Sequence, residues 1–302
     1  MKQILRWIIL GGTLFFLTKS LQNNWSEVMA IRVDAAGWAI LTTATGVTLL
    51  AHTWAGWIWT LVLQELNQPV SSSQFIQVYL KTNIAKYLPG NVWHYYGRIL
   101  AAKNANVSPG AATLSVLLEP LLMAAAALIS VIVFGGRFVG NNSLIIKILQ
   151  FLSLVLVLCA IHPWFLNPAL RILSKFKNLK NTNKPNMNLH IKRYPLRPLL
   201  GELVFLGLRG TGFILTMFAL SSLSYSQIPL LMGAFSFAWV LGLVVPGAPG
   251  GLGVFEATAI ALLQYHFPTA LVISAIALYR LISILAETAG AALASLDERY
   301  QF

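Results

Sequence analysis

The chain has 302 residues, of which 57% are hydrophobic and 10% are charged, and it carries a formal net charge of +12. Soluble domains have roughly 45–50% apolar and about 25% charged residues, so this composition excludes an ordinary soluble domain and predicts an integral membrane protein. The single cysteine, Cys159, excludes a disulfide framework and a multi-cysteine metal cluster, and its apolar sequence surroundings favour a buried position. The excess of Lys and Arg is typical of cytoplasmic membrane edges beside anionic lipids, and it does not require a nucleic acid partner.

Six stretches are long and apolar enough to be membrane spans, for which about 20 residues are needed. In chain order these predicted spans are 4–21, 37–63, 112–134, 144–166, 199–222 and 269–294. The first span follows Lys2 and Arg6, as a secretion signal would, but no small-residue cleavage site follows it. We therefore expect a retained anchor.

The segment 167–198 is the long polar stretch of the chain, with eight Lys and Arg residues and no Asp or Glu. The positive-inside rule predicts that it is a cytoplasmic loop, and this orientation places the amino and carboxyl termini in the cytoplasm. We expect a multi-pass protein of the plasma or inner membrane. The loop charges either set this topology alone or also hold anionic lipid.

Two further stretches contain helix breaks. The stretch 74–100 is interrupted at Pro89-Gly90, and the stretch 228–265 is interrupted at residues 246–253, which include two prolines and four glycines. Proline removes a backbone donor and glycine frees the backbone dihedrals, so neither helix can continue. Irregular backbone at membrane depth is tolerated only where it is buried in protein or lines a wet cavity, which predicts two re-entrant hairpins.

The predicted architecture is one polytopic, all-α integral membrane domain over residues 1–302, with about six transmembrane helices and two re-entrant helical hairpins. The halves 1–140 and 141–302 form an inverted repeat whose hairpins enter from opposite sides, as in transporters with a binding site near the midplane. In the alternative, 228–246 is a plain full span, which gives seven to eight spans and no true repeat.

Ionisable residues within apolar segments are costly and indicate function. The predicted substrate-binding residues are Lys86, Asn91, Arg98, Glu119, Arg209, Glu256, Arg280 and Glu287. The predicted helix breaks are Pro89, Gly90, Pro246, Pro249, Gly250, Gly251 and Gly253. The cations and the free N–H groups of half-helix N-termini suit a phosphate-bearing headgroup.

The carboxylates of this set either receive an amine or hydroxyl group or hold the arginines in place between substrates. Glu202 and Arg209 are seven residues apart, as are Arg280 and Glu287, so each pair shares a helix face. The alternative is that such pairs only neutralise charge between helices.

Catalytic signatures are missing from the sequence. It contains no nucleophile elbow, Walker loop, dinucleotide fingerprint or H-E-x-x-H motif, and its five histidines lack ligand spacing. We therefore predict that the protein is not an enzyme and has no cofactor and no metal site.

The two breaks carry a resemblance to a known family. They consist of Lys86-Tyr87-Leu88-Pro89-Gly90-Asn91-Val92-Trp93 with Gly97-Arg98, and of Pro249-Gly250-Gly251-Leu252-Gly253-Val254-Phe255-Glu256-Ala257. Together they resemble the paired signatures of the lysylphosphatidylglycerol synthase transmembrane-region family, a flippase-like membrane domain. The resemblance implies a membrane protein that binds or translocates a lipid, with polar residues at the breaks forming its cavity. Aminoacylating members carry an additional soluble domain, and because this chain stops at Phe302 we expect a stand-alone member without it.

We therefore expect a flippase-like protein that binds or translocates an anionic or modified phospholipid or glycolipid, with membrane lipids as its partners. One alternative is a non-catalytic membrane subunit that partners a lipid-linked glycosyltransferase or another lipid-modifying enzyme through the segment 167–198. A second alternative is a small-solute transporter. No nucleic acid partner is expected.

Overall fold

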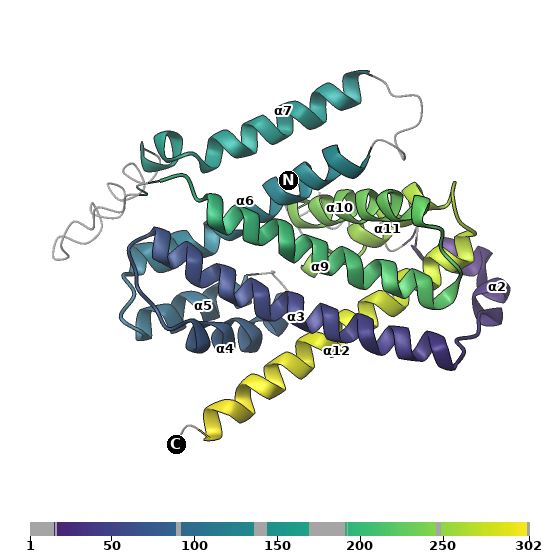
Figure 1. The fold of residues 1–302 in the computed structure, drawn as a ribbon, viewed down its shortest axis with the longest axis horizontal. Helices are drawn as coiled ribbons and strands as arrows, with labels where there is room; N and C mark the ends of the chain where they lie inside the picture. The colour runs from purple at the N-terminus through teal and green to yellow at the C-terminus, as the bar shows by residue number, and fades with distance from the viewer. Residues whose placement is uncertain are drawn as a thin grey trace.

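The computed structural model describes residues 15, 17–88, 92–135, 144–168, 191, 193–245 and 249–300 (Figure 1). Every regular element within these ranges is helical, which confirms the predicted all-α fold. The elements are α2 (Trp25–Ala30), α3 (Ala35–Glu65), α4 (Ser72–Asn83), η1 (Ile84–Tyr87), α5 (Trp93–Asn104), α6 (Pro109–Phe134), α7 (Leu144–Ile161), α9 (Leu196–Leu220), η3 (Tyr225–Gln227), α10 (Ile228–Val244), η4 (Pro249–Gly251), α11 (Val254–Leu263) and α12 (Thr269–Tyr300).

Five helical segments in the described ranges are long and apolar enough to cross a membrane. They are Ala35–Glu65, Pro109–Phe134, Leu196–Leu220, Tyr225–Val244 and Thr269–Asp297. Four of them coincide with predicted spans. The fifth contains α10, and its 20 residues reach the length of a full span, as the alternative of seven to eight spans requires. The chain is therefore a multi-pass membrane protein.

Several predicted features lie outside the described residues. These are most of the span 4–21, most of the loop 167–198, and the positions Pro89, Gly90, Asn91 and Pro246. The inverted relation between the halves 1–140 and 141–302 stays a prediction.

Local capping signals explain where two of the long helices begin. The Asp34 carboxylate accepts a hydrogen bond of 2.6 Å from the Gly37 N–H at the start of α3. The Ser108 hydroxyl accepts one of 3.4 Å from the Ala111 N–H at the start of α6, where Pro109 occupies the first turn. Both arrangements satisfy or remove N–H groups that a helix N-terminus leaves without partners.

The centre of the bundle is formed by α3 and α9, which run side by side, and α6, α10 and α12 pack around them (Figure 1). The close approach of α3 and α9 depends on small residues. A Cβ atom at Gly212 would lie 2.7 Å from the Thr48 Oγ1 atom, so a larger residue would push the helices apart. The aromatic side chains of Trp59, Phe213 and Phe235 are fully buried in the bundle.

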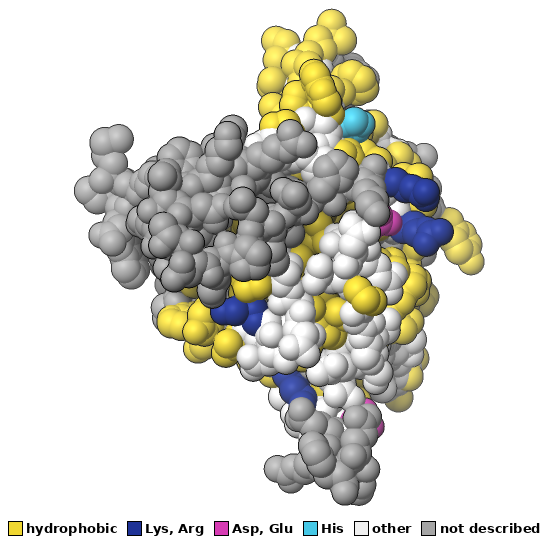
Figure 2. All heavy atoms as spheres, turned by 90° about the vertical axis from the view of Figure 1, so that its left-hand side faces the viewer, with side chains coloured by type: hydrophobic (Ala, Val, Ile, Leu, Met, Phe, Trp, Pro, Cys, Tyr) yellow, Lys and Arg dark blue, Asp and Glu magenta, His cyan; other side chains and the backbone are white. Residues whose placement is uncertain are grey.

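The outer helix α7 packs on α6 and stands apart from the bundle centre (Figure 1). It exposes a run of apolar side chains, including Leu149, Phe151 and Leu156. Cys159 on this helix is exposed, so the prediction of a buried position was wrong. An apolar sequence run predicts burial in either protein or lipid, and on a peripheral helix the apolar neighbour is lipid. Hydrophobic side chains also cover much of the coloured surface in Figure 2.

The two broken elements meet inside the bundle. α4, η1 and α5 pack on one another around the first break, and α10, η4 and α11 do so around the second. Their tips are in contact, because a Cβ atom at Gly250 in η4 would lie 3.3 Å from the ring of Tyr87 in η1. Gly250 and Gly251 have φ values of 60° and 74°, a region that L side chains rarely adopt, so the second break requires glycine.

Candidate functional site

A cavity of about 180 Å³ lies where the two broken elements meet. Lys86 of η1 and Arg98 of α5 line it from the first broken element. Gly250 and Gly251 of η4 line it from the second. The remaining wall comes from α3, α4, α6, α9, α10, α11 and α12. Residues of both broken elements therefore line one hollow, and the binding of a substrate by its polar residues stays a prediction.

The wall of the cavity carries more positive than negative charge. Four of its side chains are cations, namely Lys86, Arg98, Arg209 and Arg280, whereas Glu119 is its one carboxylate. Glu256 and Glu287 bond to these cations without lining the cavity themselves. The carboxylates thus stand behind the cations, and the cavity presents an electropositive surface.

One buried ion pair joins α5 to α6. The Arg98 guanidinium donates hydrogen bonds of 2.8 and 3.1 Å to the two oxygens of Glu119, and both side chains are nearly inaccessible. The Tyr79 hydroxyl of α4 donates a third bond of 2.9 Å to the same carboxylate, and its ring lies 3.6 Å below the guanidinium carbon. Pro120 follows Glu119 within α6, where it cannot donate the usual backbone bond.

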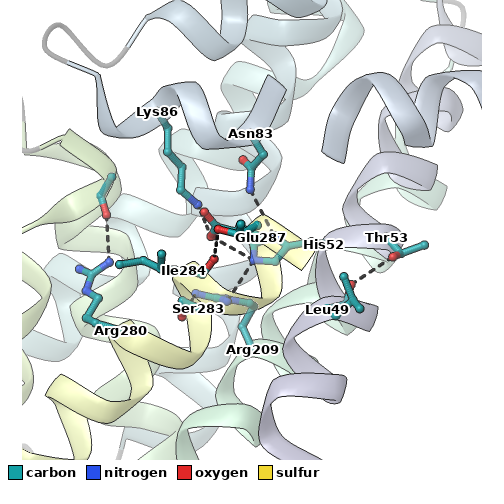
Figure 3. Close-up of polar contacts among 12 residues, drawn as sticks. Leu49, His52, Thr53, Asn83, Lys86, Arg209, Arg280, Ser283, Ile284 and Glu287 are labelled. Carbon is teal, nitrogen blue, oxygen red and sulfur yellow. Dashed lines mark hydrogen bonds and ion pairs between the residues drawn. The ribbon is translucent and has the colours of Figure 1, made fainter. Parts of the chain in front are cut away.

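A second polar network joins η1, α3, α9 and α12 (Figure 3). The Lys86 ammonium donates a hydrogen bond of 2.6 Å to Glu287 Oε1, and His52 Nε2 lies 3.1 Å from the same oxygen. Arg209 reaches His52 Nε2 at 3.2 Å and donates a bond of 3.1 Å to the Ser283 hydroxyl. This network fastens the tip of the first broken element to three long helices.

A third group holds the second break. Arg280 forms an ion pair with Glu256 and donates bonds of 3.2 and 3.3 Å to the carbonyls of Gly250 and Gly251. Glu256 in turn accepts a bond of 2.6 Å from the Gly253 N–H at the start of α11. The sequence predicts free N–H groups at such a half-helix N-terminus, but here Glu256 already occupies one of them.

The charged partners differ from those that sequence spacing suggests. Glu202 and Arg209 share a helix, as do Arg280 and Glu287, but seven residues separate their Cα atoms by about 10 Å along a helix axis. Arg280 instead bonds to Glu256 on α11, and Glu287 bonds across to η1. Neutralisation therefore occurs between elements rather than within one helix.

The structure describes all predicted binding residues except Asn91. Five of these seven residues line the cavity and the other two, Glu256 and Glu287, bond directly to residues that line it. The spacing of residues in the sequence did not indicate the aromatic and histidine partners that complete the site, although a lone polar His52 in an apolar span was an available signal. The ring centroid of Tyr79 lies 3.6 Å from the guanidinium carbon of Arg98. The ring centroids of Trp239 and Tyr279 lie 5.2 and 5.1 Å from the guanidinium carbon of Arg209.

Within the described part of the chain, His, Cys, Asp and Glu side chains form no group of three or more that could hold a metal ion. The basic side chains and tyrosine hydroxyl groups around the cavity offer recognition by charge and by hydrogen bonds. Cationic nitrogen atoms around a cavity favour an anion, and the aromatic rings restrict the positions of those cations.

Fold and site together define a multi-pass membrane protein with two broken helical elements around a charged internal cavity. The chain matches the family described as the lysylphosphatidylglycerol synthase TM region over residues 3–290, and it belongs to that family. The family relates the protein to the modification or flipping of membrane lipids. No curated protein sequence matches the chain.

Proposed function

We propose that this protein binds the anionic headgroup of a phospholipid or glycolipid in its central cavity and moves that lipid between the two leaflets. The observation that carries the proposal is the excess of cations on the cavity wall, where four basic side chains face one carboxylate. Buried charges are expensive, and Arg209, whose hydrogen-bond partners His52 and Ser283 are not carboxylates, is most stable when an anion enters.

The size of the cavity favours a headgroup as the bound part. A volume of about 180 Å³ is close to that of an engineered protein cavity of about 150 Å³ that takes up one benzene molecule. This space suits a phosphate with a small polar substituent, but it does not hold two acyl chains. The chains of a bound lipid would therefore lie outside the cavity.

The outer surface of α5 and α6 offers a place for acyl chains. On α5, Trp93, Tyr96 and Leu100 follow one helix face and are 51%, 61% and 45% exposed, whereas Arg98 faces the cavity. On α6, Leu117 and Leu121 are exposed beside the cavity-lining Glu119. The same two helices thus present a polar inner face and an apolar outer face, which favours a lipid over a small soluble anion.

The carboxylates have a role in this scheme when the cavity is empty. Each basic side chain bonded to a carboxylate avoids the cost of an unpaired buried charge. An entering phosphate then replaces the carboxylate as the charged partner of the cation, so the cation is not left unpaired.

We place the protein in the plasma or inner membrane with cytoplasmic termini, on the basis of the basic segment 167–198.

Transport by reconstituted vesicles tests the proposal. Purified protein is placed in vesicles that contain a fluorescent phosphatidylglycerol analogue, and a membrane-impermeant reductant reports which leaflet holds the probe. Loss of a charged hydrogen bond, about 1.5–3 kcal/mol, predicts that a variant without the Arg98 charge moves the probe roughly 10- to 100-fold more slowly. The variant Arg98→Leu/Glu119→Leu removes the ion pair without leaving either charge alone.

Lys103→Ala is the matched control, because Lys103 is an exposed cation on the same helix, five residues after Arg98. We expect this control to transport the probe at the wild-type rate. Equal transport by the wild-type protein and the double variant would contradict the proposed site. Uptake of inorganic phosphate without any movement of the lipid probe would favour the small-solute alternative.

A further inference from the structure

Glu202 on α9 is a buried carboxyl group that the proposed headgroup site does not use. Its residue is 1% exposed, and both carboxyl oxygens are buried without a hydrogen-bond partner. Every other buried glutamate of the described chain, at positions 119, 256 and 287, bonds to a basic side chain. A buried carboxylate without a partner costs several kcal/mol, so the charge state of the Glu202 carboxyl group needs an explanation.

The neighbours of Glu202 identify the cause. Glu202 interacts electrostatically with Glu119 and with Arg98. Arg98 already donates two bonds to Glu119, so one cation serves two buried carboxyl groups. If both carboxyl groups were ionised, these buried side chains would together hold a net negative charge, and low-dielectric surroundings disfavour such a charge.

Among the described residues, the elements around α9 do not supply a second cation. From α4, Tyr79 contributes a hydroxyl that is committed to Glu119. His52 of α3 bonds to Arg209, two helical turns along α9 from Glu202. α10 has no titratable side chain, and the ionisable residues of α12 that reach the cavity region, Arg280 and Glu287, bond elsewhere.

We propose that Glu119 and Glu202 form a proton-binding acid pair, which carries one proton on Glu202 when the cavity is empty and takes up a second on Glu119 when an anionic headgroup bonds to Arg98. The link between the two events is the shared guanidinium. Arg98 and Glu119 both line the cavity, so a phosphate that engages Arg98 competes with Glu119 for the same donors. The carboxylate that loses its cation then binds a proton from water that reaches the cavity.

The uptake of a proton by Glu119 rests on the proposed function, because it accompanies the binding of a headgroup. A lipid anion and one proton would enter the site together, and their combined charge would be zero. Such a neutral load lowers the cost of moving an anion through a low-dielectric region. The first half of the inference, the protonated Glu202, stands independently of any lipid.

Infrared spectroscopy of the purified protein tests the protonated state of Glu202. A protonated carboxyl group shows a C=O stretching band that an ionised one lacks. We expect the Glu202→Gln variant, which keeps the shape of the side chain, to lose one such band at neutral pH. Glu27→Gln is the matched control, because Glu27 is an exposed carboxylate on α2, and its spectrum in this region should equal that of the wild type.

Proton uptake tests the link to the ligand in the wild-type protein, so it remains decisive if Glu202→Gln fails to fold. Short-chain phosphatidylglycerol is added to detergent-solubilised protein in weak buffer with a pH indicator. Linkage predicts the uptake of about one proton per bound lipid, and binding that strengthens up to about tenfold for each unit by which pH falls. Glu119→Gln should bind the lipid without proton uptake, and zwitterionic phosphatidylcholine should cause none.

The outcomes separate the two proposals. An unchanged carboxyl band in Glu202→Gln would overturn the protonated state of Glu202, and lipid binding by the wild type without proton uptake would overturn the coupling. Loss of the band in Glu202→Gln, with no binding of phosphatidylglycerol by the wild type, would retain the protonated acid and reject the proposed headgroup site instead.

Discussion

Replacement of Arg98 by leucine probes the best-defined ion pair of the site. Arg98 and Glu119 are each 2% exposed, and their two hydrogen bonds of 2.8 and 3.1 Å are reinforced by the Tyr79 hydroxyl and ring. In Arg98→Leu the Glu119 carboxylate is left buried without a cation. Breaking a buried pair in this way costs about 3–5 kcal/mol, so we expect a loss of that size in the free energy of unfolding.

The double variant Arg98→Leu/Glu119→Leu separates the cost of the orphaned charge from the cost of losing the pair. Replacement of a whole buried pair by apolar residues is often neutral or stabilising, so we expect this variant to recover most of the lost stability. Glu119→Leu alone should cost less than Arg98→Leu, because the remaining Arg98 can pair with Glu202 once that group releases its proton.

Equilibrium unfolding in mixed detergent micelles measures the free energy of unfolding of the three variants, and the double-mutant cycle gives the coupling energy between Arg98 and Glu119. Residues in direct contact couple by about 0.5–3 kcal/mol, and a buried ion pair belongs at the upper end of this range. A double variant that is as unstable as the sum of the two single variants would show no coupling. That result would refute the reasoning that the pair, rather than the size of its side chains, determines stability here.

Two other predictions concern the breaks. Gly251→Ala adds a Cβ atom at a φ of 74°, 3.3 Å from the backbone of Gly242. We therefore expect about 1–3 kcal/mol of destabilisation in thermal unfolding. The control is Gly207→Ala, which has open space at its Cβ position and should not lose stability. Glu287→Gln removes the 2.6 Å ion pair that fastens Lys86 to α12, so we expect faster amide hydrogen exchange in η1, and unchanged exchange would contradict the tether.

The spans of this protein follow from the length of its apolar runs. The predicted span 37–63 corresponds to α3 at Ala35–Glu65, and the predicted span 112–134 to α6 at Pro109–Phe134. The agreement has a physical basis, because the hydrocarbon requires about 20 apolar residues and capping residues such as Asp34 mark the helix start. The second break was also predictable, because glycine readily adopts the positive φ angles that interrupt a helix. Gly250 has such an angle in the structure.

The members of the site were easier to predict than their bonds. Arg98 and Arg280 stood out because a basic residue in an apolar segment is costly and needs a partner. Helix periodicity assigns a face to each residue, but it does not state which neighbouring helix covers that face. The pairing of Arg280 with Glu256, and the approach of His52 to Glu287, depend on that packing.

The sequence by itself determined that the chain lies in a membrane. It also determined the positions of the long helices, the positions of two helix breaks and the ionisable residues that lie within apolar segments. These properties are set locally, by apolar length, by the dihedral limits of proline and glycine, and by the cost of desolvating a charge. Only the tertiary structure decided that the charges surround one cavity, that its wall is electropositive and that Glu202 is left without a bonded partner. The physical reason is that hydrogen bonds act over about 3 Å, and residues as distant in the chain as Lys86 and Glu287 reach that separation only when the helices pack.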